Sequence, residues 1–264
     1  MATSLGVRLP YDIIGHIIDI LAAEGDLAPV KNASLTSSSV LHFCPRHIFH
    51  TIPFCNRTES LKTPFIKLLS TSPAIVQYIR ELNFDVYSDS KLSPPLPKLL
   101  HTISLLKCLR IRSFIHHWTV MDPLLQSALL HLMYLPTLTH LVISSMHNIP
   151  ISAFAPCINL EHLDIRCTTL APLEDDECPS LQMCSSKTPR ILQFKNLGFH
   201  RAVEELLRAK WKDGRPVLDF SYVKTLELEF ATFRDVQLTR EIFENFRYLE
   251  DLKINGMIHF VKFL

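Results

Sequence analysis

The sequence contains few glycines: six among 264 residues, with no two within eight positions of each other. A phosphate-binding loop of the P-loop type needs two glycines five positions apart, and a dinucleotide-binding loop needs three within six residues. The nucleophile elbow Gly-x-Ser-x-Gly needs two glycines four positions apart. The scarcity of glycine therefore excludes these three kinds of site and the enzymes that depend on them.

The sequence also lacks paired cysteine motifs. Its seven cysteines include no Cys-x-x-Cys pair, and an odd number cannot form a closed set of disulfides. Cys108, Cys157 and Cys167 lie among apolar residues, which are common surroundings for a buried free thiol. We therefore expect no zinc ribbon, and we expect an intracellular, reducing location that is either cytoplasmic or nuclear.

Neither an excess of one charge nor a long apolar run is present. The net charge is +1, from 27 basic and 26 acidic residues, so the overall charge does not favour nucleic acid or an acidic membrane. No run of 18 apolar residues occurs, and Asp12 and Asp19 interrupt the apolar stretch that a secretory signal requires. We expect neither nucleic acid nor a membrane as a partner.

An amphipathic helix is predicted over residues 9–21. Pro10 suits the first turn of a helix, and Asp12 places a negative charge at its positive end. Apolar side chains then recur at helical spacing, at Ile13, Ile14, Ile17, Ile18 and Leu21. Two further short helices are predicted over residues 30–40 and about 45–51. Three short helices form only a very small core, which is marginally stable without a partner.

Three stretches occur in order near the amino terminus. They are Leu9-Pro10-x-Asp12-Ile13-Ile14-x-x-Ile17-Ile18-x-x-Leu21, Ala33-Ser34-Leu35-Thr36 and Arg46-His47-Ile48-Phe49. Together they resemble an F-box, a three-helix motif that binds the Skp1 adaptor of cullin–RING ubiquitin ligases. The resemblance covers residues 7–52 and implies adaptor contacts at Leu9, Pro10, Ile13, Ile14, Ile17, Ile18, Leu21, Leu35 and Phe49. Val40 departs from the family, which usually has Trp there. The alternative is an ordinary amphipathic helix that packs on the rest of the chain.

The rest of the chain repeats the pattern apolar-x-x-Leu-x-apolar. Clear copies begin at Ile79, Leu106, Leu138, Leu160, Val223 and Leu249, and a weaker copy begins at Pro189. Successive copies start 22 to 34 residues apart, close to the roughly 20–29 residues of leucine-rich repeats. Each copy predicts a short strand whose leucines face one way.

Segments with helical spacing lie between these copies and begin near Phe65, Leu124, Val203 and Ile242. A repeated strand and helix predict an α/β fold, with a curved parallel sheet and helices on its convex side. The Asn or Cys that usually follows the strand in leucine-rich repeats is absent, so we expect an irregular solenoid. The alternative is a strand–helix alternation that arises by coincidence in another α/β protein.

A second resemblance involves the run Phe65-x-x-Leu68-Leu69-x-x-Ser72-Pro73-x-Ile75-x-x-Tyr78-Ile79-Arg80-x-Leu82-x-Phe84. It looks like the degenerate F-box and leucine-rich-repeat proteins abundant in mushroom-forming fungi. With the amino-terminal match, the resemblance spans nearly the whole chain and implies two parts, an F-box-like motif over 7–52 and a repeat region over 53–264. The largely apolar segment 257–264 predicts either a buried terminal strand or a truncated gene product.

The resemblance implies a substrate-recognition adaptor of a Skp1–cullin–F-box ubiquitin ligase. Its amino-terminal helices are expected to bind a Skp1-like adaptor protein, and its repeats are expected to bind a target protein that the sequence does not identify. The alternative is a free-standing leucine-rich-repeat interaction module without a link to ubiquitin ligases.

Side chains with catalytic or metal-binding spacing are not evident. The thirteen histidines include no His-Glu-x-x-His, and the adjacent His116 and His117 point apart on a strand. His140 and His162 occupy equivalent places in two repeats and are predicted to stack on the sheet surface. The acidic run 174–177 is predicted to be a solvated loop or a site for a basic segment of the target. We expect no enzyme activity, no metal and no cofactor.

Overall fold

The computed structural model describes residues 9–55, 59–87, 95–173, 187–198, 200–230 and 244–256. The helices are α1 (Tyr11–Ala23), α2 (Ala28–Ser34), α3 (Ser38–Leu41), α4 (Pro45–Ile48), α5 (Glu59–Thr71), α6 (Pro95–Leu100), α7 (Pro123–Met133) and α8 (His200–Arg208). Short 3-10 helices are η1 (Pro73–Tyr78), η2 (Trp118–Val120) and η3 (Ile151–Phe154). The strands are β1 (Thr51–Cys55), β2 (Glu81–Val86), β3 (Cys108–His117), β4 (His140–His147), β5 (Ile149–Pro150), β6 (His162–Arg166), β7 (Leu170–Ala171), β8 (Gln193–Leu197), β9 (Thr225–Phe230) and β10 (Asp251–Gly256).

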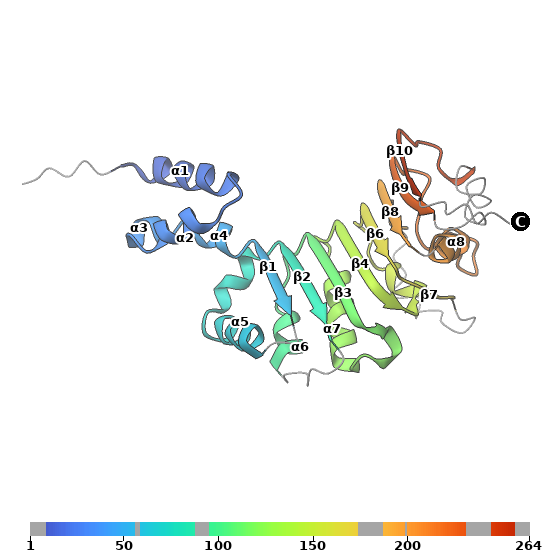
Figure 1. Ribbon diagram of the computed structural model, residues 1–264, viewed down its shortest axis with the longest axis horizontal. Coiled ribbons are helices and arrows are strands. Elements are labelled where there is room, and N and C mark those ends of the chain that lie inside the picture. The colour runs from blue at the N-terminus through green and yellow to red at the C-terminus, as the bar shows by residue number, and fades with distance from the viewer. Residues whose placement is uncertain are drawn as a thin grey trace, which may run out of the picture.

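One open parallel sheet dominates the α/β fold (Figure 1). Its eight strands follow one another in the order β1-β2-β3-β4-β6-β8-β9-β10, which is also their order along the chain. Every neighbouring pair is parallel. After each strand the chain therefore returns to the edge of the sheet at which the strands begin, before it enters the next strand. Helices α5, α6 and α7 lie on one side of this sheet. The predicted parallel sheet is therefore confirmed.

The central leucines of the sequence repeats stand side by side in the sheet. Leu82 pairs with Leu109, Leu109 with Leu141, and Leu141 with Leu163. The same row continues through β8 to Leu226 on β9 and ends on β10. The spacing of the six clear copies thus predicted both the position and the alignment of six strands.

The weaker copy is shifted by two residues from its predicted position. Phe194, not Leu192, pairs with Leu163, and Ile191 occupies the first apolar position of the copy. The last position is held by Asn196, which is fully buried. Because an asparagine stands where the pattern has an apolar residue, the correct register was hidden in the sequence.

The first strand, β1, was not predicted. Ile52 and Phe54 face the core and pair with Leu82 and Phe84, the last two apolar positions of the copy in β2. Neither residue is leucine, so β1 does not match the repeat pattern. Pro53 lies within the strand, where its missing N–H is tolerated because β1 is an edge strand. The division expected between residues 52 and 53 therefore falls inside β1.

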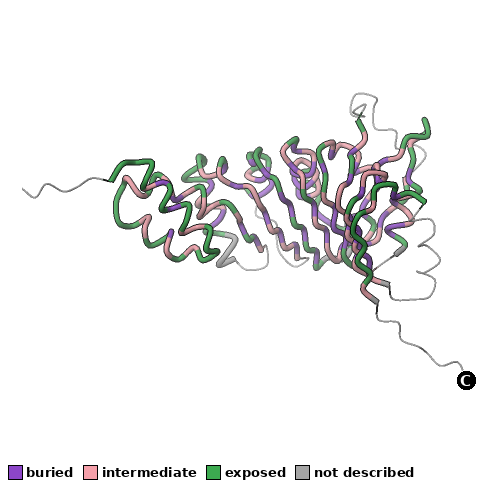
Figure 2. The backbone as a smooth tube through the Cα atoms, turned by 90° about the horizontal axis from the view of Figure 1, so that it is seen from above, coloured by how far each residue is buried: buried purple, intermediate pink, exposed green. Residues whose placement is uncertain are grey.

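The aligned apolar residues and helices α5 to α8 form one continuous core. Figure 2 shows that buried positions alternate with less buried ones along the strands. Helix α7 packs its Leu125, Leu129 and Leu132 into this core. Its start is fixed by Asp122, whose side chain accepts hydrogen bonds from the first N–H groups of the helix. Full burial of one such leucine stabilises the fold by about 1.5–3 kcal/mol.

Helices α1 to α4, which we call the helical unit, project from the β1 end of the sheet (Figure 1). Its buried hydrophobic residues are Ile18, Val30 and Cys44, which form a cluster separate from the core of the sheet. The helix predicted over 30–40 is wrong, because α2 ends at Ser34 and α3 begins at Ser38. The Ser37 hydroxyl accepts a hydrogen bond of 3.2 Å from the Val40 N–H and caps α3. The third predicted helix is shorter than expected, since Thr51 begins β1.

Several sequence features lie outside the described residues. These are the acidic run 174–177, the terminal segment 257–264 and the start of the helix expected near Ile242. The parts of the chain that the structure describes contain no helix that is long and apolar enough to cross a membrane.

Candidate binding surfaces

Helix α1 carries apolar side chains on two faces. Ile18 is 2% exposed and lies in the core of the helical unit, and Ile14 and Leu21 are half-buried on the same face. The single stripe expected from the sequence is thus divided, and this inward face holds the helical unit together.

The second face of α1 is open to solvent. Leu9 is 54% exposed, Ile13 43%, Ile17 42% and Ile20 51%. Ile13, Ile17 and Ile20 follow one another at intervals of four and three, so they lie on one side of α1, and Leu9 lies just before its first turn. We call these four residues the α1 stripe. Adjacent exposed apolar residues of this kind make this face of α1 a candidate surface for binding a partner.

The remaining expected adaptor contacts lie in different surroundings. Pro10 is exposed next to the α1 stripe, and Leu35 is 85% exposed between α2 and α3. Phe49 is half-buried and packs against the core of the sheet. Val40, which replaces the usual Trp, packs against the small core of the helical unit.

An ion pair network joins α1 to α4. Arg46 Nη2 lies 2.5 Å and His47 Nε2 lies 2.7 Å from Asp19 Oδ1. Partial burial alone would raise the pKa of Asp19, but the hydrogen bonds from His47 and Arg46 hold this pKa below its ordinary value. Asp19 therefore links α1 to α4 through its ion pairs.

The sheet presents a polar surface opposite its core, which we call the open face. Its side chains alternate with the buried leucines along each strand. Opposite charges on neighbouring strands are paired there. The pairs are Arg110–Glu81, Arg112–Asp85, Lys195–Glu227 and Lys253–Glu227, and Arg166 pairs with Asp164 on its own strand. These charged side chains of the open face are thus each paired with a specific side chain of opposite charge.

Glu227 is the most strongly held carboxylate of the open face. Its two oxygens lie 2.7 Å from Lys195 Nζ and 3.0 Å from Lys253 Nζ, on the two flanking strands. Hydrogen bonds from these lysines lower the pKa of Glu227 to about 2. Glu227 therefore connects β8, β9 and β10 through its charge.

Two histidines stack on the open face, as the sequence predicted. The rings of His140 and His162 lie 4.0 Å apart and are nearly parallel, with an angle of 6°. His162 Nδ1 lies 2.7 Å from Gln193 Oε1. Burial and the neighbouring His162 lower the pKa of His140. Both causes favour the neutral form of His140.

A groove of about 690 Å³ lies over the first strands of the open face. Strands β1, β2, β3, β4 and β6 line it, and three arginines reach it, Arg110, Arg112 and Arg166. Val142 and Ser144 on β4 contribute small, uncharged side chains between them. The groove has the size of a binding site for part of a peptide.

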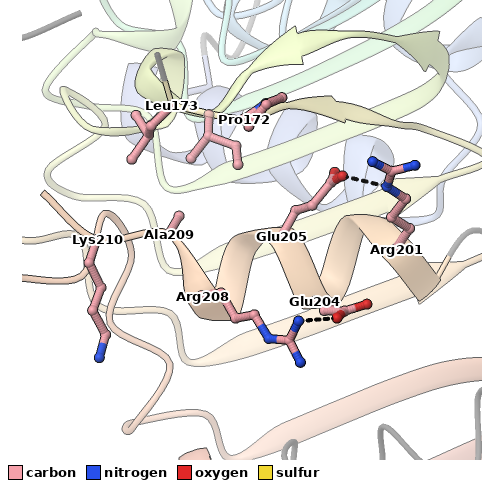
Figure 3. Close-up of a pocket in the computed structure, with 9 residues that line it drawn as sticks. Pro172, Leu173, Arg201, Glu204, Glu205, Arg208, Ala209 and Lys210 are labelled. Carbon is pink, nitrogen blue, oxygen red and sulfur yellow. Dashed lines mark hydrogen bonds and ion pairs between the residues drawn. The ribbon is translucent and has the colours of Figure 1, made fainter. Parts of the chain in front are cut away.

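A second hollow, of about 420 Å³, lies between α8 and the segment after β7 (Figure 3). Arg201 Nε lies 2.8 Å from Glu205 Oε1, and Arg208 pairs with Glu204, so charged groups of α8 neutralise one another. The described residues contain no group of three or more His, Cys, Asp or Glu side chains that could hold a metal ion.

Sequence reasoning missed residues on both surfaces. Ile20 belongs to the α1 stripe, and its position seven residues after Ile13 is the signal that would have found it. Arg110, Arg112 and Arg166 were not singled out. Their alternation with the apolar residues of each strand indicates that they face away from the core.

No family model matches the chain, and no curated protein is significantly similar to it in sequence.

Proposed function

We propose that this protein is a substrate-recognition adaptor of a Skp1–cullin–F-box ubiquitin ligase. The helical unit is an F-box that binds a Skp1-like adaptor, and the sheet is an irregular leucine-rich-repeat solenoid that binds a target protein on its open face. The resemblance of the sequence to an F-box supports the first part, and the aligned leucines support the second.

The observation that carries this proposal is the exposure of the α1 stripe. The helical unit has a core of its own, so Leu9, Ile13 and Ile17 are not required to hold it together. They are also not covered by the sheet. An apolar stripe on one side of a helix is a usual way to bind a partner, and burial of such side chains supplies most of the binding free energy.

The mechanism requires no chemistry from this chain. A protein that holds both the ligase scaffold and a target raises the concentration of the target near the ubiquitin-transfer enzyme. The rate gain then comes from proximity and orientation. The two surfaces must therefore bind at the same time, which their positions on different parts of the fold allow.

The alternative is a free-standing interaction protein whose first helices cap the end of the sheet. In that case α1 is expected to bury its apolar stripe against β1 and α5. The stripe is 42–54% exposed, which favours the adaptor function.

Binding of a purified Skp1-like adaptor tests the proposal. We expect Ile17→Asp to weaken binding at least a hundredfold, because an unpaired charge buried in an interface costs about 3–5 kcal/mol. Val120→Asp is the matched control, since Val120 is also apolar and is 71% exposed on η2 in the sheet region. If the wild type does not bind, or if the two variants bind alike, the proposal is wrong.

A further inference from the structure

Three residues of the open face stand in one row across three neighbouring strands. Arg112 on β3 pairs in register with Ser144 on β4, and Ser144 pairs with Arg166 on β6. Adjacent strands lie about 4.8 Å apart, so the two arginines start roughly 10 Å from each other with a small side chain between them. Two long cationic side chains therefore flank one uncharged position.

Both arginines have ion-pair partners that are less exposed than the arginines are. Arg112 Nε lies 3.3 Å from Asp85 Oδ1, and the side chains are 61% and 27% exposed. Arg166 Nε donates to both oxygens of Asp164, at 3.0 and 3.1 Å, with side chains 47% and 12% exposed. Asp85 on β2 stands beside Arg112, on the side away from Ser144, and Asp164 lies two residues before Arg166 on β6. Both carboxylates are less exposed than the arginines that they pair with. A partner that approaches this row meets positive charge first.

An aromatic surface adjoins the row. The rings of Tyr87 and Phe114 lie 4.2 Å apart and nearly parallel, with an angle of 6°. Phe114 is 38% exposed, and Arg112 Cζ lies 6.0 Å from the centre of its ring. A partly exposed aromatic pair beside a cation suits a polypeptide, which offers an apolar side chain next to an acidic one. A free inorganic anion would make no use of the rings.

We propose that the groove binds an extended peptide segment in which an Asp or Glu carboxylate lies over Ser144, between Arg112 and Arg166. Each guanidinium presents several N–H donors in a plane, which suits a carboxylate. A neighbouring apolar side chain of the peptide lies on Phe114. This inference rests on the proposed function only in assigning the peptide to the target of a ubiquitin ligase.

The charge of the row favours a carboxylate over a phosphate. The two arginines and their two aspartate partners sum to zero charge. A phosphate brings a charge of about −1.5 to −2 and would lie near Asp85 and Asp164, whereas a carboxylate brings one negative charge. The guanidinium groups that face outward balance the smaller charge more readily.

Selection from a display library of random, unphosphorylated 12-residue peptides on the full-length protein tests the proposal. We expect enrichment of Asp or Glu next to Leu, Ile or Phe, and at least a tenfold loss of binding of the selected peptides by Arg112→Gln/Arg166→Gln. Lys212→Gln, a change of an exposed lysine outside the sheet, is expected to bind them like the wild type. The absence of enrichment, enrichment without acidic residues, or equal binding by the double variant would overturn the proposal.

Two further measurements show whether a negative result concerns the peptide site or the proposed function. A selected peptide is synthesised with Glu and with phosphoserine at the enriched position, and tenfold tighter binding of the phosphopeptide would overturn the assignment of a carboxylate. The same protein samples are assayed for Skp1 binding. Arg112→Gln/Arg166→Gln is expected to keep it, and Ile17→Asp is expected to keep the peptide, so the two surfaces are judged independently.

A variant that needs no ligand tests the geometry directly. Ser144→Asp places a carboxylate at the proposed position of the ligand, so we expect a higher melting temperature than for Ser144→Asn, which has the same shape without charge. The difference is expected to shrink in 1 M salt, since salt screens exposed charges. Ser144→Asp is also expected to weaken peptide binding at least tenfold. A melting temperature at or below that of Ser144→Asn would overturn the inference that both arginines can reach a carboxylate at position 144.

Discussion

The helical unit and the sheet use apolar residues in different ways. The sheet buries a continuous row of apolar residues from β2 to β9, all leucines except Phe194, and faces the solvent with paired charges. Of its hydrophobic side chains, the helical unit fully buries Ile18, Val30 and Cys44, and it leaves the α1 stripe exposed. A region that can bury its apolar residues internally is stable on its own, whereas a region that cannot gains stability from a partner. This contrast is the reason why we propose that the α1 stripe binds the Skp1-like adaptor and that the open face binds the target.

The largest expected effect lies in the sheet. Phe84 is fully buried and stacks 5.0 Å from Phe54. We expect Phe84→Ala to lower the free energy of unfolding by about 3–5 kcal/mol, because it leaves a cavity in a close-packed core. Both tryptophans, Trp118 and Trp211, lie in the sheet region, so tryptophan fluorescence during denaturation reports this loss. An unchanged transition would contradict the continuity of the core.

A smaller effect is expected in the helical unit, and it separates the two faces of α1. Ile18→Ala is expected to lower the stability of the unit by about 2 kcal/mol or more, whereas Ile17→Ala is expected to change it by about 0.5 kcal/mol or less. Hydrogen exchange of residues 11–48 measures this change, and tryptophan fluorescence is expected to detect neither variant. Equal effects of the two substitutions would mean that the α1 stripe is part of the core.

The smallest effect concerns the charges of the open face. The pKa of Glu227 is lowered from 4.5 to about 2, so its ion pairs stabilise the fold above about pH 4.5 and are lost as the pH falls from 4.5 towards 2. We expect Glu227→Gln to lower the melting temperature at pH 7 and to resemble the wild type near pH 2. Glu250→Gln is the control, because its ion pair with Lys224 is exposed on both sides. A difference that does not depend on pH would contradict this role of Glu227.

The sequence predicted those parts of the fold that repeat. Six strands could be placed because leucine recurs at Leu82, Leu109 and the equivalent positions, and α7 could be placed because Leu125 and Leu129 recur at helical spacing. Strand β1 was missed because Ile52 and Phe54 replace the expected residues around a proline. The copy in β8 was shifted because Asn196 interrupts its pattern.

The binding surfaces were predictable only in part. The apolar residues of α1 were found, but their division into an inward and an outward face depends on where α2 and α3 pack, and Ile18 and Ile17 look alike in the sequence. The row of Arg112, Ser144 and Arg166 depends on the register of strands that lie 22 to 32 residues apart in the chain. Such a row exists only after the sheet has formed, so no local pattern reveals it.

Hydrogen exchange of the full-length protein with and without a Skp1-like adaptor tests the central claim most directly. We predict that the adaptor slows exchange in α1 and in the segment around Leu35, because it covers the α1 stripe and stabilises a unit with a small core. Exchange in β2, β3, β4 and β6 is predicted to stay unchanged, which leaves the open face available to the target. Unchanged exchange in α1, or protection that falls mainly on the sheet, would contradict the assignment of the two surfaces.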